Sequence, residues 1–95
     1  MLIGQAKIDF EEWYMECYEK ENLPYIQGFY IASFSCQYGV IVDWFDSVGI
    51  YIQIYKANSM YFYSIDYNSN FDIFKTRPQA RQKAIEKANE IYNNR

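Results

Sequence analysis

The sequence contains no histidine, only two cysteines, and four glycines that stand apart from one another. The missing histidine excludes Ser–His and Cys–His nucleophile pairs, histidine-ligated zinc and the most common general base near neutral pH. Two separated cysteines cannot form a thiolate zinc site on their own, and isolated glycines cannot form a phosphate-binding loop. We therefore expect a protein that is not an enzyme and that holds neither a cofactor nor a metal ion.

A carboxylate pair of the glycosidase kind is the catalytic arrangement that the composition leaves open. Its candidates are Asp43, Asp46 and Asp66. Asp46 is explained by a predicted turn, and Asp43 falls near the edge of a predicted strand, so this interpretation is disfavoured.

Long apolar runs are also missing. No stretch approaches the roughly 20 apolar residues that a membrane helix needs, and Met1 to Lys7 lacks the pattern of a secretory signal peptide. Cys17 and Cys36 are expected to be reduced, half-buried thiols, with a single disulfide in an exported protein as the alternative. The expected location is the cytoplasm, without a membrane partner.

Aromatic residues, by contrast, are abundant. They make up 21% of the 95 residues, eleven of them tyrosine, and the hydrophobic fraction is 51%. This length predicts one domain over residues 1–95. Each tyrosine carries a large apolar ring and a hydroxyl that needs a partner, so many are expected to be half buried at core edges or at interfaces.

Three runs of strand-forming residues are apparent, Val40–Phe45, Ile50–Tyr55 and Met60–Tyr67. Between the first two, Asp46 and Gly49 fit a type I turn with a bulge, which predicts a hairpin. A break at residues 57–59 precedes the third run. These runs predict an antiparallel meander of three or four strands.

The predicted hairpin has two different faces. One is aliphatic and the other is aromatic with polar groups; the second carries Ile41, Asp43, Phe45, Tyr51, Gln53 and Tyr55. For the third run, the length of the second turn decides whether Tyr61, Tyr63 and Ile65 or Met60 and Phe62 join the aliphatic face.

One helix is predicted before the meander in the sequence and another after it. The first begins with Asp9 as its N-cap, after an unstructured lead-in over residues 1–6, and ends near Leu23-Pro24. Its apolar stripe is Phe10, Trp13, Tyr14, Cys17 and Tyr18. Residues 24–38 fit either a further strand with a bulge at Gly28 or an irregular segment at the sheet edge.

The last helix has the clearest signals. Thr76 is the predicted N-cap, Pro78 lies in the first turn, and residues 93–94 end the helix. Its buried stripe is Ala80, Ala84, Ile85, Ala88, Ile91 and Tyr92. The predicted fold is therefore α+β: an N-terminal helix, the meander, and a C-terminal helix packed on the sheet.

Charge divides the chain. Residues 1–74 contain ten acidic and three basic residues, for a net charge of −7, whereas residues 75–95 contain six basic and two acidic residues, for +4. The basic surface of the last helix comprises Lys75, Arg77, Arg81, Lys83 and Lys87. It is interpreted as a solvated face, a contact for an acidic protein or a nucleic-acid site, and the acidic remainder of the chain disfavours nucleic acid.

The acidic residues of the first helix allow the reverse idea, a protein that mimics DNA. They are Glu11, Glu12, Glu16, Glu19 and Glu21. An ordinary solvated helix face explains the same residues, and we favour that interpretation.

The tyrosine-rich strand face is the best functional lead. If both helices covered the aliphatic face, a partner-binding surface of Phe45, Tyr51, Gln53 and Tyr55 would be exposed. In the alternative, the first helix and residues 25–34 cover it.

Residues 45–54, 76–81 and 84–93 together resemble small uncharacterised proteins of bacteriophages and prophages. The resemblance implies a context: such acidic, cofactor-free proteins often bind a host protein, and some inhibit CRISPR and other defence systems in the host cytoplasm. The expected function is thus a non-enzymatic protein-binding module, and the more specific role that the resemblance implies is that of a phage inhibitor of a host defence complex. The alternatives are a nucleic-acid binder that uses the basic helix and a self-assembling structural component, including a homodimer.

Overall fold

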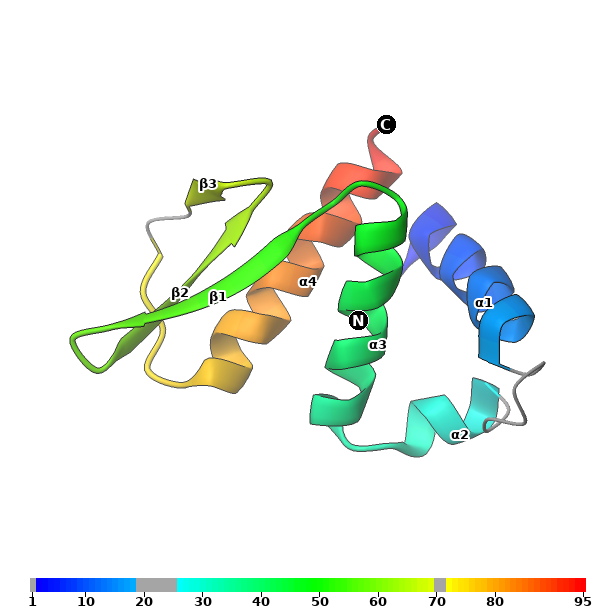
Figure 1. Ribbon diagram of the computed structural model, residues 1–95, viewed down its shortest axis with the longest axis horizontal. Coiled ribbons are helices and arrows are strands. Elements are labelled where there is room, and N and C mark those ends of the chain that lie inside the picture. The colour runs from blue at the N-terminus through cyan, green and yellow to red at the C-terminus, as the bar shows by residue number, and fades with distance from the viewer. Residues whose placement is uncertain (1, 19–25, 70–71) are drawn as a thin grey trace.

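The computed structural model of the protein describes residues 2–18, 26–69 and 72–95. It has α+β architecture, as predicted, with a β-hairpin at one end, helices α1 and α2 at the other, and helices α3 and α4 between them (Figure 1). The molecule measures 42 × 29 × 18 Å along its principal axes. Its elements are α1 (Gly4–Tyr18), α2 (Ile26–Ile31), α3 (Phe34–Ser47), β1 (Ile52–Ala57), β2 (Met60–Ile65), β3 (Asn68–Ser69) and α4 (Arg77–Asn93).

The predicted first strand, Val40–Phe45, is wrong: these residues belong to helix α3. Ser33 caps this helix, since its side chain accepts a hydrogen bond from the Cys36 amide at 3.4 Å. The buried residues of α3 are Gln37, Ile41, Trp44 and Phe45, which recur at the spacing of one helix face. The helical period over this longer window outweighs the strand preference of the short run of Val and Ile.

The predicted hairpin turn after Phe45 is instead the end of α3. The Ile50 amide donates to the Phe45 carbonyl at 2.8 Å, and the Gly49 amide donates to the Asp46 carbonyl at 3.1 Å. These two bonds, with Gly49 at φ +84°, form a Schellman motif. The left-handed glycine was thus predicted correctly, but it ends a helix rather than closing a hairpin.

The sheet does not match the predicted meander of three or four strands, because it consists of one two-stranded hairpin and a two-residue third strand. Strands β1 and β2 form an antiparallel hairpin that pairs Ile52 with Ile65 and Ile54 with Tyr63. The two-residue strand β3 adds to β2, and an isolated bridge joins Tyr61 to Phe74. Two-residue turns at 58–59 and 66–67 connect the strands, and all four of their residues have positive φ, as type I′ turns require.

The second and third runs of strand-forming residues were predicted correctly. Ile52, Tyr63 and Ile65 are buried on the hairpin face that packs on α4, so the alternative that placed Tyr61, Tyr63 and Ile65 with the aliphatic residues is confirmed. Tyr51, Gln53 and Tyr55 point to the other face.

The first helix begins earlier than predicted, at Gly4 rather than after Asp9. Asn93 of α4 fixes this start: its Oδ1 accepts from the Ala6 amide at 2.8 Å, and its Nδ2 donates to the Ile3 carbonyl at 2.9 Å. A Cβ at Gly4, whose φ is +67°, would lie 2.9 Å from the Asn93 Nδ2. Residues 2–6 are therefore structured and not a frayed lead-in, and Leu2 and Ala6 among them are buried in the core.

The apolar stripe of α1 is confirmed for its first three residues. Phe10 and Tyr14 are buried, and Trp13 packs against the core. Cys17 is exposed, which corrects the prediction that it is half buried. The predicted end of this helix near residues 23–24 lies outside the described residues.

Residues 26–38 form neither the strand nor the irregular segment that the sequence allowed. They form α2 and the start of α3. The buried Gln37 joins the two helices, because its Nε2 donates to the carbonyls of Phe29, Tyr30 and Ala32 at 2.9–3.1 Å. These carbonyls lie at the end of α2, where intrahelical partners are missing.

Helix α4 confirms its prediction at both ends. The Thr76 side chain accepts from the Gln79 amide at 3.4 Å, and Asn94 is the C-cap. Its buried residues include Ala80, Ala84 and Ala88, whose small side chains let the helix approach the hairpin closely. No helix among the described residues has both the length and the apolar character that a membrane span requires.

Candidate functional site: the open face of the hairpin

The four predicted partner-binding residues separate into one buried and three surface residues. Phe45 lies on α3, is fully buried and packs on Trp44 with their ring centroids 4.8 Å apart. It cannot contact a partner, because the strand that was expected to carry it is a helix. The other three predicted residues do lie together: Tyr51 directly precedes β1, and Gln53 and Tyr55 belong to it.

Hydrogen bonds link these three side chains in a row along the strand. Gln53 Nε2 donates to the Tyr51 hydroxyl at 3.1 Å, and the Tyr55 hydroxyl donates to Gln53 Oε1. Because Gln53 has both a donor and an acceptor, it bonds a tyrosine on each side. The row is thus held in one arrangement before any partner arrives.

Two further aromatic residues, missed in the sequence, extend the row. Phe62 stacks on Tyr55 with ring centroids 5.2 Å apart, and Tyr67 lies against Tyr51 at 5.5 Å. Phe62 is the cross-strand neighbour of Tyr55. We call Tyr51, Gln53, Tyr55, Phe62 and Tyr67 the tyrosine face. The signal that could have found Phe62 is the turn at 58–59, since a two-residue loop sets the register that places it opposite Tyr55.

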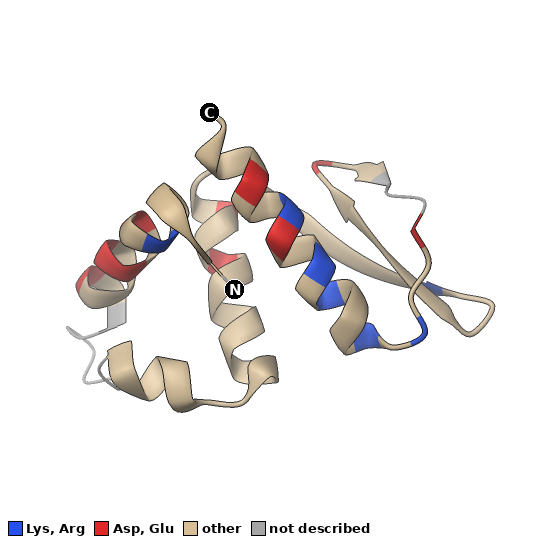
Figure 2. Cartoon of the chain, turned by 180° about the vertical axis from the view of Figure 1, so that it is seen from behind, with Lys and Arg blue, Asp and Glu red and all other residues tan. Residues whose placement is uncertain are grey.

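No helix among the described residues covers the tyrosine face. Figures 1 and 2 show the hairpin from its two sides, with α4 against one face and α1 and α2 at the other end of the molecule. The alternative in which the first helix and residues 25–34 cover this face is therefore wrong for the described residues. Tyr67 is 80% exposed and Tyr55 is 38% exposed.

Tyr67 also has an unusual backbone. Its φ is +68°, in the left-handed region that bulky residues rarely adopt. The turn is held by Asp66, whose amide donates to the Tyr51 carbonyl at 2.8 Å and whose Oδ1 accepts from the Tyr51 amide at 2.9 Å. The consequence is an aromatic ring presented to solvent at the corner of the tyrosine face.

The predicted basic surface is only partly available. Lys83 and Lys87 each pair with the glutamate three residues on, at 3.1 Å and 3.5 Å. Arg77 and Arg81 lie over tyrosine rings instead, and Lys75 is exposed in the segment before α4. The five residues therefore do not form one continuous set of unpaired cations.

The two arginines take part in a cluster that the sequence did not reveal. Arg81 lies over the Tyr38 ring at 4.8 Å, and Arg77 and Lys56 lie over the Tyr61 ring at 5.4 Å and 5.8 Å. We call these five residues the tyrosine–cation patch. Burial raises the pKa of Tyr38, while the charges of Arg81 and then Arg77 act in the lowering direction.

Figure 2 shows several acidic residues on α1, at the opposite end, whereas most Lys and Arg residues lie along α4 and near the hairpin tip. Two tyrosines bond α1 carboxylates: the Tyr30 hydroxyl donates to Glu11 at 2.6 Å, and the Tyr92 hydroxyl donates to Asp9. The pKa of Tyr30 is raised by burial and then by Glu11, and that of Tyr92 is raised mainly by its bond to Asp9.

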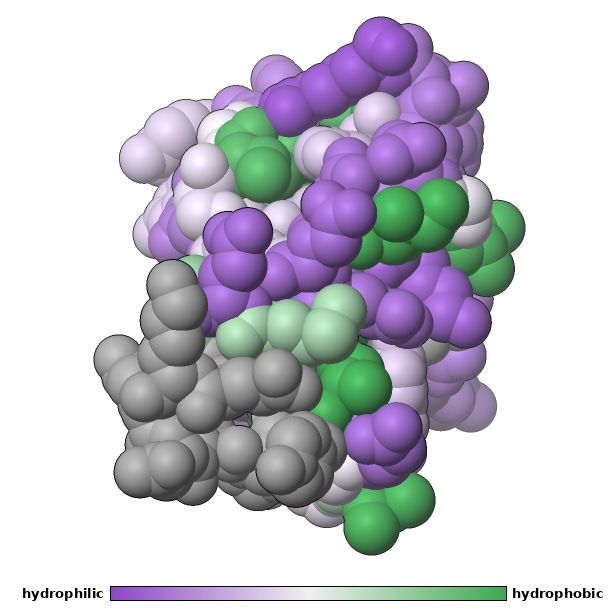
Figure 3. All heavy atoms as spheres, turned by 90° about the vertical axis from the view of Figure 1, so that its right-hand side faces the viewer, coloured by the Kyte–Doolittle hydropathy of each residue, from purple (hydrophilic) through white to green (hydrophobic). Residues whose placement is uncertain are grey.

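The surface at the α1 end differs from the tyrosine face. Figure 3 shows it as mostly hydrophilic, with separate hydrophobic patches. Ile8 and Met15 are exposed on α1. Of the residues proposed for DNA mimicry, Glu11 accepts a hydrogen bond from the Tyr30 hydroxyl, and Glu19 and Glu21 lie outside the described residues.

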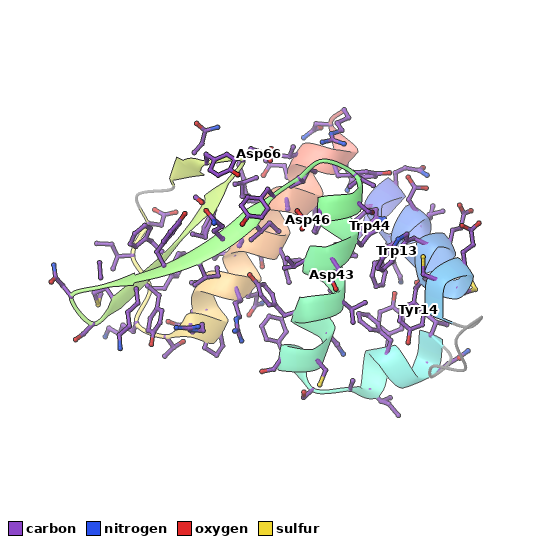
Figure 4. All side chains as sticks on the ribbon, viewed as in Figure 1. Trp13, Tyr14, Asp43, Trp44, Asp46 and Asp66 are labelled. Atoms are coloured by element: carbon purple, nitrogen blue, oxygen red, sulfur yellow. The ribbon has the colours of Figure 1, made fainter. Side chains whose placement is uncertain are left out.

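The three candidate catalytic carboxylates come from different places. Asp43 and Asp46 are exposed on α3, whereas Asp66 lies in the turn between β2 and β3 (Figure 4). Asp66 is engaged by the Tyr51 amide. Within the described part of the chain, no group of three or more acidic or cysteine side chains could hold a metal ion.

A hollow of about 200 Å³ lies between α3 and α4, lined by Phe34, Gln82, Ile85 and Glu86. Its one carboxylate, that of Glu86, is paired with Lys83. The free thiols of Cys17 and Cys36 are exposed on separate helices and add no group to this hollow. The tyrosine face is therefore the most developed candidate site.

A comparison with protein-family models found no match for this chain, and no curated protein or solved structure matched it either.

Proposed function

We propose that the protein is a non-enzymatic protein-binding module that contacts its partner through the tyrosine face. The observation that carries this proposal is the row of Tyr51, Gln53 and Tyr55, which are hydrogen-bonded to one another on the side of the hairpin that no described helix covers (Figure 1).

Three properties of this face suit protein recognition. Tyrosine supplies a large contact area and loses little side-chain freedom on binding, which is why it is enriched at the centres of interfaces. The hydrogen bonds through Gln53 fix the rings in advance, so less ordering is needed when a partner binds. Tyr67 presents its ring from a backbone conformation that costs energy, and such strain is concentrated at functional sites.

The narrower expectation, inhibition of a host defence complex by a phage protein, is supported only by the resemblance of the sequence and stays a prediction. The self-assembly alternative uses the same face with a second copy as the partner. Light scattering on a size-exclusion column separates the two: a dimer that Tyr51→Glu splits assigns the face to self-association and overturns the proposal.

The test of the proposal is affinity capture from a lysate of the cells in which the gene is expressed, quantified by mass spectrometry. The variants are Tyr51→Glu with Tyr55→Glu, and a matched control, Ile8→Glu with Ile31→Glu, which places the same two charges on residues of α1 and α2 that are 54% and 87% exposed. We expect at least one protein to be captured by the wild type and the control and lost with the tyrosine variant. Capture that is equal for all three proteins would mean that this face is the wrong one.

A further inference from the structure

The cations of α4 have two kinds of neighbours. Lys83 and Lys87 are neutralised by glutamates of the same helix. Arg77 and Arg81 lie over tyrosine rings, as does Lys56 of β1. A ring face holds a cation in place but does not cancel its charge, so these three residues keep the ability to bind an anion. The Nε atom of Arg81 is buried and lacks a hydrogen-bond partner among the described residues.

The patch brings together four elements of the fold. Lys56 and Tyr61 are directly opposite each other on β1 and β2, while Tyr38 is on α3 and the two arginines are on the first turns of α4. Because Lys56 lies two and four residues from Ile54 and Ile52, it points to the α4 side of the hairpin. The cations therefore lie on the opposite side of the hairpin from the tyrosine face.

Strand β1 is an outer strand of the sheet, whose order is β1-β2-β3. The Asp66 amide bonds the Tyr51 carbonyl, so Tyr51 and Asp66 form a hydrogen-bonded pair. Along an antiparallel ladder, hydrogen-bonded pairs alternate with pairs whose backbone groups point away from each other. The residues Ile52, Ile54 and Lys56 belong to the second kind of pair, so their amide and carbonyl groups point away from β2. On β2 the same alternation directs Tyr61 away from β1, where it bonds Phe74 in both directions at 2.8 Å.

We propose that the tyrosine–cation patch and the free edge of β1 bind an extended, acidic segment of a protein partner. The segment pairs with the outward amide and carbonyl groups of Ile54 and Lys56 as an added strand. Every second side chain of an added strand points to the α4 side. Carboxylates at those positions meet Lys56, Arg77 and Arg81, and the side chains between them extend the tyrosine face.

Three observations favour an acidic protein segment over a nucleic acid. Each tyrosine ring of the patch already has a cation over it, whereas single-stranded nucleic acid is held largely by bases that stack on aromatic rings. The chain as a whole has a net charge of −3, which opposes a polyanion but has less effect on a short segment with a few carboxylates. A strand edge also provides backbone hydrogen bonds that only a peptide can complete.

The test uses the full chain, labelled with ¹⁵N, and a synthetic peptide of alternating glutamate and threonine, with alternating lysine and threonine as the charge control. At low ionic strength we expect the acidic peptide to shift the amide signals of Ile54, Lys56, Arg77 and Arg81. The double variant R77Q/R81Q should weaken this binding about tenfold, since it removes two charge contacts. The variant K83Q/K87Q is the matched control, because it removes the same charge from the same helix and should change the affinity less than about twofold.

A second pair of variants separates the strand edge from the charge. Lys56→Pro removes both the outward amide and the charge, whereas Lys56→Gln removes only the charge. We expect Lys56→Pro to weaken binding more than Lys56→Gln, with a dispersed amide spectrum confirming the fold. Equal effects of the two variants would overturn strand addition, and equal effects of R77Q/R81Q and K83Q/K87Q would overturn the patch as the site.

Three other outcomes contradict the proposal. Absence of any shift with the acidic peptide at millimolar concentration would remove the site. Tighter binding of oligothymidylate at the same amides would assign it to nucleic acid. Salt-sensitive self-association that R77Q/R81Q abolishes would assign it to the acidic end of a second copy. The variant Tyr51→Glu leaves the tyrosine–cation patch and the edge of β1 in place. Failure of this proposal can therefore be distinguished from failure of the proposed function.

Discussion

The two ends of the molecule use the same residue types in opposite ways. At the helical end Tyr14 is only 3% exposed and lies against Phe29 and Phe10, in a core where Phe10 also meets Trp44 edge to face at 5.8 Å. At the hairpin end Tyr67 is 80% exposed. One end is closed by helices on several sides, whereas the hairpin is covered on one face only. The difference teaches that aromatic content alone does not distinguish a core from a surface; the number of covering elements does.

Replacing Trp44 tests the closed end and should have the largest effect. Trp44 is 1% exposed and contacts Phe10, Phe45 and Tyr92. Trp44→Ala should lower the free energy of unfolding by about 3–5 kcal/mol, because it removes a large buried ring and leaves a cavity. Phe62→Ala is the matched change on the tyrosine face and should cost about 1 kcal/mol or less, since it removes one surface stack. Urea denaturation measures both, and similar losses would mean that the hairpin face is packed like the core.

The contrast between Val40–Phe45 and Ile50–Tyr55 shows how much of the fold the sequence predicts. Both runs favour strands, yet the first is helical because Ser33 caps it and its wider neighbourhood has a helical period. The wrong prediction of a hairpin turn at 46–49 has a similar cause. Gly49 suits a hairpin bulge and a Schellman motif equally well, and only the hydrogen bonds of the Gly49 and Ile50 amides distinguish the two. The last helix was predictable because its cap, proline and alanine stripe are all local signals.

The candidate site was predictable in part for the same reason. Tyr51, Gln53 and Tyr55 share a face by strand alternation, which is local. Phe45 was misplaced with the strand that does not exist. The tyrosine–cation patch joins Tyr38 of α3 to Arg81 of α4, residues far apart in sequence, and such a contact depends on how the helices pack. The start of α1 was missed because asparagines near the other end of the chain hold it.

Tyr92 offers a smaller test of the closed end. Its hydroxyl donates to Asp9 and its pKa is raised mainly by that bond, then by burial. A raised pKa in the folded state stabilises the protonated form, so this contribution is complete below the unfolded pKa of about 10 and is lost as the pH rises through the folded value. Tyr92→Phe should therefore cost about 1–2 kcal/mol at pH 7, and the difference from the wild type should shrink above about pH 10.

Thermal unfolding from neutral to alkaline pH measures that difference. Glu11 and Tyr30 form a second pair of this kind. The difference in stability between Tyr30→Phe and the wild type should therefore also shrink over the same alkaline range. A difference for Tyr92→Phe that stays constant with pH would contradict the prediction, because the bond to Asp9 requires the protonated Tyr92 hydroxyl.

The smallest expected effect concerns Tyr67 and sharpens the comparison at the open end. Its φ of +68° is costly for any residue with a Cβ and costs glycine little. Tyr67→Gly should therefore be more stable than Tyr67→Ala by about 1 kcal/mol, which reverses the usual order of these two residues. Both variants lose the contact with Tyr51, so their difference in urea denaturation reports the backbone alone. If both variants also fail to capture the partner while the glycine variant remains stable, the exposed ring is kept for binding at a cost in stability. If Tyr67→Ala is as stable as Tyr67→Gly, the turn relaxes without cost. The backbone of Tyr67 would then give no support for a function of this residue.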